Sequence, residues 1–261
     1  MLRRPDTLAP VAQTESPAAS DRNVVRLHDT YDDEFFFVDT VECPISGTVF
    51  DYLRVRTKAV RPISRDSDFF VRYKGTDPAL YSLLVCPRCA YTSYRDDFDD
   101  LTDEERVALR ATAESRVVMV PRSLCGARTP EDNIVATDLA LRCYGQRRPN
   151  ERRRAVLLHR RAWSERERGD TTAELKYLAS ARAAYQSAFE RDAGISDESA
   201  VRAAYLIGEL WLRLGEPVEA SRWLETAIRV PGAKNQSGLI RLARERLFDA
   251  RKAYGEQRRA S

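Results

Sequence analysis

The sequence predicts an α+β fold, in which a small β module is followed by an α-helical domain. Residues 34–100 are dense in β-branched and aromatic residues, and polar and apolar positions alternate from Phe50 to Arg56, which is the pattern of half-buried strands. From Glu151 onward, apolar residues recur at helical spacing. We divide the chain into four parts: a disordered tail (1–33), the β module (34–100), a helical connector (101–150) and the helical domain (151–261).

Composition limits the function classes that the chain can support. The 261 residues are 43% hydrophobic, which is enough for a buried core, and 43 Lys+Arg against 40 Asp+Glu leave a net charge of +3. Overall charge therefore provides no argument for a nucleic-acid or membrane partner. The only histidines are His28 and His159, which almost excludes catalytic triads and multi-histidine metal sites. No phosphate-loop, dinucleotide or nucleophile-elbow motif occurs, so we expect no enzymatic activity.

The N-terminal segment and the cysteines predict the compartment. Residues 1–33 are rich in Pro, Ala, Ser and Thr and lack hydrophobic periodicity, which is typical of disorder. They contain no apolar core of signal-peptide length, and no apolar run approaches the roughly 20 residues of a membrane helix. Five cysteines with one C-x-x-C spacing favour metal or redox chemistry over a disulfide framework. We therefore expect a cytoplasmic protein with no membrane partner.

The β module predicts strands that lead into two cysteine-containing turns. FFFVDTVECPISGTVFDYLRVRTKAV predicts short strands around a turn at residues 44–47. The segment SRDSDFFVRYKGTDP predicts a loop, and residues 80–85 predict a strand that ends at Cys86. In the loop, Asp66 and Asp68 would share one face if extended, and we expect them to form salt bridges with Arg61, Arg65 or Arg72 rather than a cation site.

The connector predicts two helices. Thr102 is a suitable N-cap, with Glu105 completing a capping box, for a helix to about Val120. Thr129 and Pro130 predict the start of a second helix that ends near residue 144. The acidic run over residues 96–105 is interpreted as helix initiation on a solvated surface.

The helical domain contains a stretch, residues 201–227, that resembles a tetratricopeptide repeat. Small residues where two helices meet, large residues between them and a glycine in the turn carry the resemblance: Gly208, Ala220, Trp211, Leu224 and Gly215. An irregular earlier copy begins near Ala155, with a long second helix to about Asp192, and a final helix over residues 238–254 would cap the array. A groove between such helices would bind a protein or peptide. Helix position suggests three contact residues: Tyr177, Arg202 and Tyr205.

The two Cys-Pro turns predict a metal site. In a C-P-x-C knuckle a tight turn directs two thiolates at one metal, and two such knuckles supply the four ligands of a structural zinc ribbon or rubredoxin-like site. The knuckle Cys86-Pro-Arg-Cys89 is intact, whereas the first has Cys43 but Ser46 in place of its second cysteine. A serine hydroxyl is a poor zinc ligand near neutral pH because it resists deprotonation. We therefore predict three metal ligands: Cys43, Cys86 and Cys89.

Three outcomes remain open for this incomplete ligand set. Zinc could be retained with a fourth ligand from Cys125, which stands in the loop PRSLCGART, from a nearby Asp or from water. Alternatively, packing around Phe50 and Tyr91 holds the module without metal. A redox pair of Cys86 and Cys89 is the third, which the lack of a thioredoxin-like βαβ pattern disfavours. Cys143, inside a helical segment, is interpreted as a buried small hydrophobe.

Three segments resemble a known bacterial family. CPISGTVF, RDSDFFVRYKGTDPALYSLLVCPRCAYTSYRDDF and GARTPEDNIVATDLALRCY are similar to the uncharacterised family called domain of unknown function 2225. The resemblance covers roughly residues 34–230 and implies two C-P-x-C knuckles joined to a C-terminal helical region similar to tetratricopeptide repeats. The sequence departs from the family at Ser46 and at Ala90, where a glycine is usual. The family implies no activity.

A basic stripe between the connector and the helical domain defines the alternative function. It contains seven arginines: Arg147, Arg148, Arg152, Arg153, Arg154, Arg160 and Arg161. At spacings of three and four on a helix they could bind phosphates, or they could dock against the acidic run at 96–105.

We predict a non-enzymatic protein-interaction scaffold with a zinc knuckle pair. The alternatives are a nucleic-acid-associated zinc-ribbon protein that uses this stripe and an open-site metalloenzyme with three thiolates and water on zinc.

Overall fold

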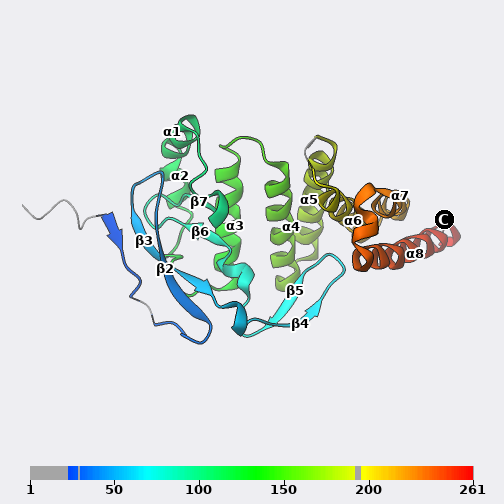
Figure 1. The fold of residues 1–261 in the computed structure, drawn as a ribbon, viewed down its shortest axis with the longest axis horizontal. Coiled ribbons are helices and arrows are strands. Elements are labelled where there is room, and N and C mark those ends of the chain that lie inside the picture. The colour runs from blue at the N-terminus through cyan, green and yellow to red at the C-terminus, as the bar shows by residue number, and fades with distance from the viewer. Residues whose placement is uncertain (1–22, 29, 192–194, 261) are drawn as a thin grey trace, which may run out of the picture.

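Among the described residues, the computed structural model has three small sheets, which lie between residues 24 and 94 (Figure 1). The structure describes residues 23–28, 30–191 and 195–260. In the largest sheet, ordered β1-β3-β2, strands β2 (Phe36–Glu42) and β3 (Val49–Val55) are antiparallel and are joined by the predicted turn. The short β1 (Val24–Val25) is parallel to β3.

The folded module begins earlier than predicted. The expected tail, residues 1–33, lies largely outside the described residues, but β1 falls within it. Val24 and Val25 pair with Val49 and Phe50. The edge of β3 that faces away from β2 offers unpaired backbone groups, and this pairing satisfies some of them. Such a pairing has no local sequence signal.

A hairpin occupies the segment that the sequence predicted to be a loop. Strands β4 (Arg61–Arg65) and β5 (Val71–Lys74) are antiparallel, with an irregularity between Pro62 and Ser64. The loop prediction was wrong because β4 is exposed throughout and β5 alternates only between exposed and half-buried positions, so no core-facing pattern marks them. The hairpin extends beneath the central helices toward the C-terminal ones (Figure 1).

The third sheet packs on the connector helix α3 (Pro130–Tyr144). Strands β6 (Leu83–Val85) and β7 (Thr92–Tyr94) are antiparallel and fully buried. Leu83 and Val85 form one apolar cluster with Leu139 of α3 and Leu157 of the next helix. This cluster joins the β module to the helical domain.

The first connector helix is shorter than predicted. Thr102 and Glu105 form the expected capping box, but α1 (Asp103–Ala111) ends before Thr112 and a second short helix, α2 (Ala113–Val117), follows. The guanidinium of Arg116 is buried and donates to the carbonyl of Leu109 at 2.7 Å. It thereby satisfies an acceptor at the end of α1 that a continuing helix would have paired internally. The other helix predicted for the connector, α3, begins after the predicted N-cap residue Thr129.

In the described part of the chain, five further α-helices follow, and each packs against the next in chain order. In Figure 1, α3, α4 and α5 stand side by side and α6, α7 and α8 continue the row. Their bounds are α4 Glu151–Arg168, α5 Thr171–Arg191, α6 Asp197–Arg213, α7 Pro217–Arg229 and α8 Ser237–Ala260. The long second helix of the irregular copy and the final helix both form where expected. Among the described residues, no helix is long and apolar enough to cross a bilayer.

Gly208 allows α6 and α7 to approach closely, as the sequence predicted. A Cβ on Gly208 would lie 2.7 Å from Cγ of Leu224, a fully buried side chain of α7. We therefore expect Gly208→Val to lower the free energy of unfolding by about 2 kcal/mol through overpacking, measured by urea denaturation. Gly255→Val in α8 is the matched control, because nothing lies within 4 Å of its Cβ position. An equal effect of both substitutions would show that the close approach is unimportant.

Candidate metal centre

The two Cys-Pro turns adopt the same backbone structure. In the first, the N–H of Gly47 donates to the carbonyl of Cys43 at 2.9 Å; in the second, the N–H of Ala90 donates to that of Cys86 at 3.0 Å. Gly47 and Ala90 both have positive φ, +67° and +52°. This left-handed conformation favours glycine and is strained in alanine. It explains why a glycine is expected at position 90.

The matched turns make Ser46 the structural counterpart of Cys89. Each is the fourth residue of its turn, three positions after the leading cysteine. The Oγ of Ser46 lies 3.4 Å from Sγ of Cys86, and Sγ of Cys43 lies 3.7 Å from Sγ of Cys89. Each contact therefore joins a residue of one turn to a residue of the other. Ser46 occupies the place of the missing fourth thiol.

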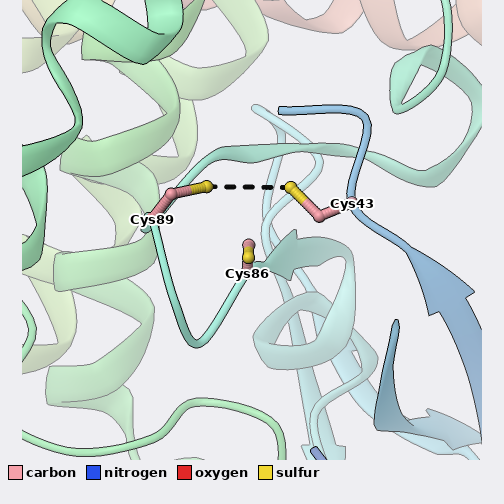
Figure 2. A group of neighbouring side chains, drawn as sticks. All are labelled: Cys43, Cys86 and Cys89. Carbon is pink, nitrogen blue, oxygen red and sulfur yellow. Dashed lines mark hydrogen bonds between the residues drawn. The ribbon is translucent and has the colours of Figure 1, made fainter. Parts of the chain in front are cut away.

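The three sulfur atoms converge in the buried core of the β module. Figure 2 shows Cys43, in the turn after β2, directed toward Cys89, with Cys86 beside them after β6. Their sulfur atoms all lie within 4.8 Å of one another, and the three side chains are buried. Phe50, Tyr91 and Phe98 belong to the same buried cluster. Among the described residues these cysteines form the one group of this kind that could hold a metal ion.

The geometry fits a tetrahedral thiolate site. With Zn–S bonds of about 2.3 Å, tetrahedral ligands lie about 3.8 Å apart, which is close to the observed 3.7 Å between Cys43 and Cys89. The slightly shorter Ser46–Cys86 distance agrees with the shorter bond that oxygen makes to zinc. The hydroxyl of Ser46 also donates to Oγ1 of Thr48 at 3.0 Å, which leaves an oxygen lone pair available to a metal.

The thiols influence each other's ionisation. Hydrogen bonds from Cys43 and Cys89 lower the pKa of Cys86, and the same contacts, together with burial, raise the pKa values of Cys43 and Cys89. The ionisation of each thiol therefore depends on the protonation of the other two. A bound dication would allow all three groups to ionise, since metal binding displaces thiol protons.

The structure separates the other two cysteines from this group. Cys125 lies in the same apolar core, and its backbone carbonyl accepts from the N–H of Leu53 in β3, but its sulfur is outside the converging set. Burial raises its pKa. Cys143 of α3 is fully buried, and its sulfur accepts from the N–H of Thr92 at 3.3 Å. Cys143 is therefore buried as the sequence predicted, and the sulfur of Cys125 is not part of the converging group.

The three predicted partner contacts lie in different environments. Tyr205 is fully buried, and its hydroxyl donates to the carbonyl of Ser67 in the β4–β5 hairpin at 2.7 Å, so it cannot be presented to a partner. Arg202 is exposed and stacks on Phe69 of the same hairpin. Tyr177 is half-buried beneath the guanidinium of Arg161. The tip of the β4–β5 hairpin (residues 66–70) therefore covers Tyr205 and contacts Arg202, whereas Tyr177 contacts Arg161 of α4.

The basic stripe is largely paired within the molecule, and it docks in part against the acidic run as the sequence suggested. Arg153 forms an ion pair with Asp97 at 2.7 Å, and Arg148 forms one with Asp100 at 3.0 Å. Arg161 is buried with carboxylates of its own helix and of α3, and Arg160 donates to Ser82. Arg152 is exposed and has no ion pair among the described residues. The stripe is therefore not a continuous phosphate-binding surface.

The hairpin tip (residues 66–70) carries a charged network. The sequence predicted its ion pair with Arg72 but not its contacts with α4. The fully buried carboxylate of Asp68 accepts from Arg166 at 2.6 Å and from the indole of Trp163 at 3.1 Å, and it lies 3.4 Å from Nε2 of His159. Asp66 pairs with Arg72, as predicted, and also with Arg166. The partners on α4 are 91 or more residues away in sequence, and nothing local indicates them.

Comparison with known proteins identifies the family. The family model described as "Uncharacterized protein conserved in bacteria (DUF2225)" matches residues 36–250. No curated protein and no solved structure matches the chain. The matched range contains both Cys-Pro turns and most of the helical domain, including α7 and much of α8. The chain belongs to the bacterial DUF2225 family, as its sequence motifs indicated.

Proposed function

We propose that the protein is a non-enzymatic interaction scaffold whose β module is held together by zinc bound to Cys43, Cys86 and Cys89. The observation that carries the metal proposal is the convergence of three buried sulfur atoms from two matched turns, with the hydroxyl of Ser46 at the fourth position. A closed site made from buried thiolates is typical of structural zinc. Such a site would tie the turn after β2 to the turn after β6.

The helical array supports the scaffold part of the proposal. Helices α4 to α8 pack in chain order, which is the arrangement of repeat proteins that bind partners along an extended surface, and it favours the resemblance to tetratricopeptide repeats. Because the hairpin tip covers Tyr205, the partner surface would include the exposed face that carries Arg202 and the outer helices, where Phe248 is exposed. Zinc-ligating thiols must stay reduced, which favours the cytoplasm as the working compartment.

Metal analysis of purified protein tests this proposal. We expect about one zinc per chain, measured by inductively coupled plasma mass spectrometry, and loss of that zinc in Cys86→Ser. Cys125→Ser and Cys143→Ser are matched controls, because each replaces a buried cysteine outside the converging set. Zinc-free wild-type protein, or loss of zinc in a control variant that remains folded, would contradict the assignment.

Restoring the fourth thiol gives a second test. We expect Ser46→Cys to raise zinc affinity by about tenfold or more, because a thiolate would replace a neutral hydroxyl at a position already within ligand distance. Competition with a chromophoric chelator measures the change. Thr48→Ser, which retains the hydroxyl that Ser46 contacts, should leave the affinity close to that of the wild type. An unchanged affinity in Ser46→Cys would show that position 46 does not face the metal.

A further inference from the structure

A cavity of about 510 Å³ lies between the β4–β5 hairpin and helices α4, α5 and α6. Its size is within the range of small-molecule sites, about 300–1,000 Å³. It is separate from the cysteine group, since none of the three cysteines lines it. The walls combine aromatic side chains with cationic ones, and the residues that the argument uses are Arg65, Arg160, Arg202, Phe70, Trp163 and Tyr185.

The cationic side chains of the cavity lack carboxylate partners. Arg65, Arg160 and Arg202 line it, and among the described residues none of them forms an ion pair. Arg65 and Arg202 stack over the ring of Phe69, at 4.8 and 4.6 Å from its centroid. Phe69 has a φ of +70°, an uncommon and strained conformation for a bulky residue. This conformation places the aromatic ring in contact with both guanidinium groups.

The carboxylates of the cavity do not cancel this charge. Asp68 is already compensated by Arg166 and Arg213, at 2.6 and 3.5 Å. Asp77 accepts from the N–H of Ala79 at 2.8 Å, and burial raises its pKa against the opposing charge of Arg160. Three guanidinium groups thus face one uncompensated carboxylate, which leaves the cavity with a positive charge that suits a dianion.

The aromatic residues that line the cavity indicate which group a ligand would carry in addition to its negative charge. The rings of Phe70 and Trp163 pack against each other at an interplanar angle of 35°, with their centroids 5.6 Å apart. Both side chains line the cavity. Tyr185 lines it as well, and its hydroxyl lies 3.5 Å from Nδ1 of the buried His159. Aromatic walls bind planar apolar groups, and a fixed hydroxyl can orient a polar substituent.

We propose that this cavity binds a small phosphate monoester with an aromatic group, the phosphate held by Arg160, Arg202 and Arg65 and the ring placed against Phe70 and Trp163. Arginine suits this role because its planar fork of donors matches phosphate oxygens in a bidentate manner. The site is independent of metal binding, and it shares Arg202 with the partner surface proposed above.

Isothermal titration calorimetry of the full chain tests the proposal with four probes: phenyl phosphate, adenosine 5′-monophosphate, phenol and inorganic phosphate. We expect at least one ester to bind more tightly than phenol and inorganic phosphate, because only an ester carries both parts. Arg202→Gln and Arg160→Gln should each weaken that binding by about tenfold, the loss of one charge-assisted contact. Arg152→Gln, which removes an exposed arginine outside the cavity, should leave it unchanged.

Two results would overturn the assignment. The first is that neither ester binds more tightly than phenol or inorganic phosphate. The second is that Arg152→Gln weakens binding as much as Arg202→Gln, which would indicate nonspecific attraction to basic surface. Arg202→Gln is the decisive variant, because Arg202 is exposed, stacks on the ring of Phe69 and forms no ion pair among the described residues, so its replacement should leave the fold intact.

Discussion

Removing zinc is expected to lower the melting temperature of the wild-type protein by about 8 °C or more. A metal that binds only the folded chain stabilises it by about 4 kcal/mol when its free concentration is about 1,000 times its dissociation constant, and for a chain of this size each kcal/mol changes the melting temperature by about 2–4 °C. Cys43, Cys86 and Cys89 lie within one buried cluster of the β module, so without the metal three thiols remain buried in mutual contact. Differential scanning calorimetry with and without chelator measures the change.

The variants separate metal loss from a packing defect. Cys86→Ala is expected to melt at a lower temperature than the wild type and to show no further decrease when chelator is added, because its site is already disrupted. Cys143→Ala also creates a small cavity in the same part of the core, but it should still respond to chelator. A wild-type protein whose melting temperature does not change with chelator would refute a structural role for metal.

Asp68→Asn is expected to reduce the free energy of unfolding by about 3 kcal/mol, the lower end of the range for breaking a buried ion pair. The Asp68 side chain is fully buried, and its neutralisation leaves Arg166 and Arg213 without their shared carboxylate. Because Asp66 and Glu174 continue to pair with Arg166, we expect a loss at the lower end of the range for a broken buried ion pair. Urea denaturation near pH 7 measures the loss.

The same side chain predicts a dependence on pH. Burial alone would raise the pKa of Asp68, but hydrogen bonds from His159 and Arg166 and the charge of Arg213 lower it overall. A carboxylate with a lowered pKa in the folded state stabilises the fold above its unfolded pKa of about 3.9, and this contribution is lost as the pH falls below that value. The stability difference between wild type and Asp68→Asn should therefore be constant above about pH 5 and become smaller below pH 4.

His159 adds a second acid-sensitive step. Burial lowers the pKa of His159, against the opposing effect of Asp68, so the folded chain holds it neutral. The unfolded chain binds a proton there near pH 6.5, and wild-type stability should begin to fall below that pH. Asp66→Asn is the control for both steps, because this carboxylate is partly exposed and its loss should cost at most about 1 kcal/mol. A pH-independent difference between wild type and Asp68→Asn would contradict the ionised state of Asp68.

The local features of this protein could be predicted from its sequence. The two Cys-Pro turns, the capping box at Thr102 and the N-cap at Thr129 depend on residues a few positions apart, and the structure contains them where expected. The close approach of α6 and α7 at Gly208 was predicted for a related reason, since consecutive helices joined by a short turn must pack against each other. The exposed hairpin had no such signal, because its strands have no regular core-facing pattern.

Long-range contacts decided what these local features do. The sequence by itself determined that two similar turns, one with Ser46 in place of a cysteine, precede a series of helices. Only the tertiary structure brought the turns together, excluded Cys125 from the thiol group and placed the hairpin tip, through Ser67 and Asp68, against helices 91 to 146 residues further along the chain. Turn and helix geometry follow from neighbouring residues, whereas the burial of Asp68 depends on partners that meet only when the whole chain is packed.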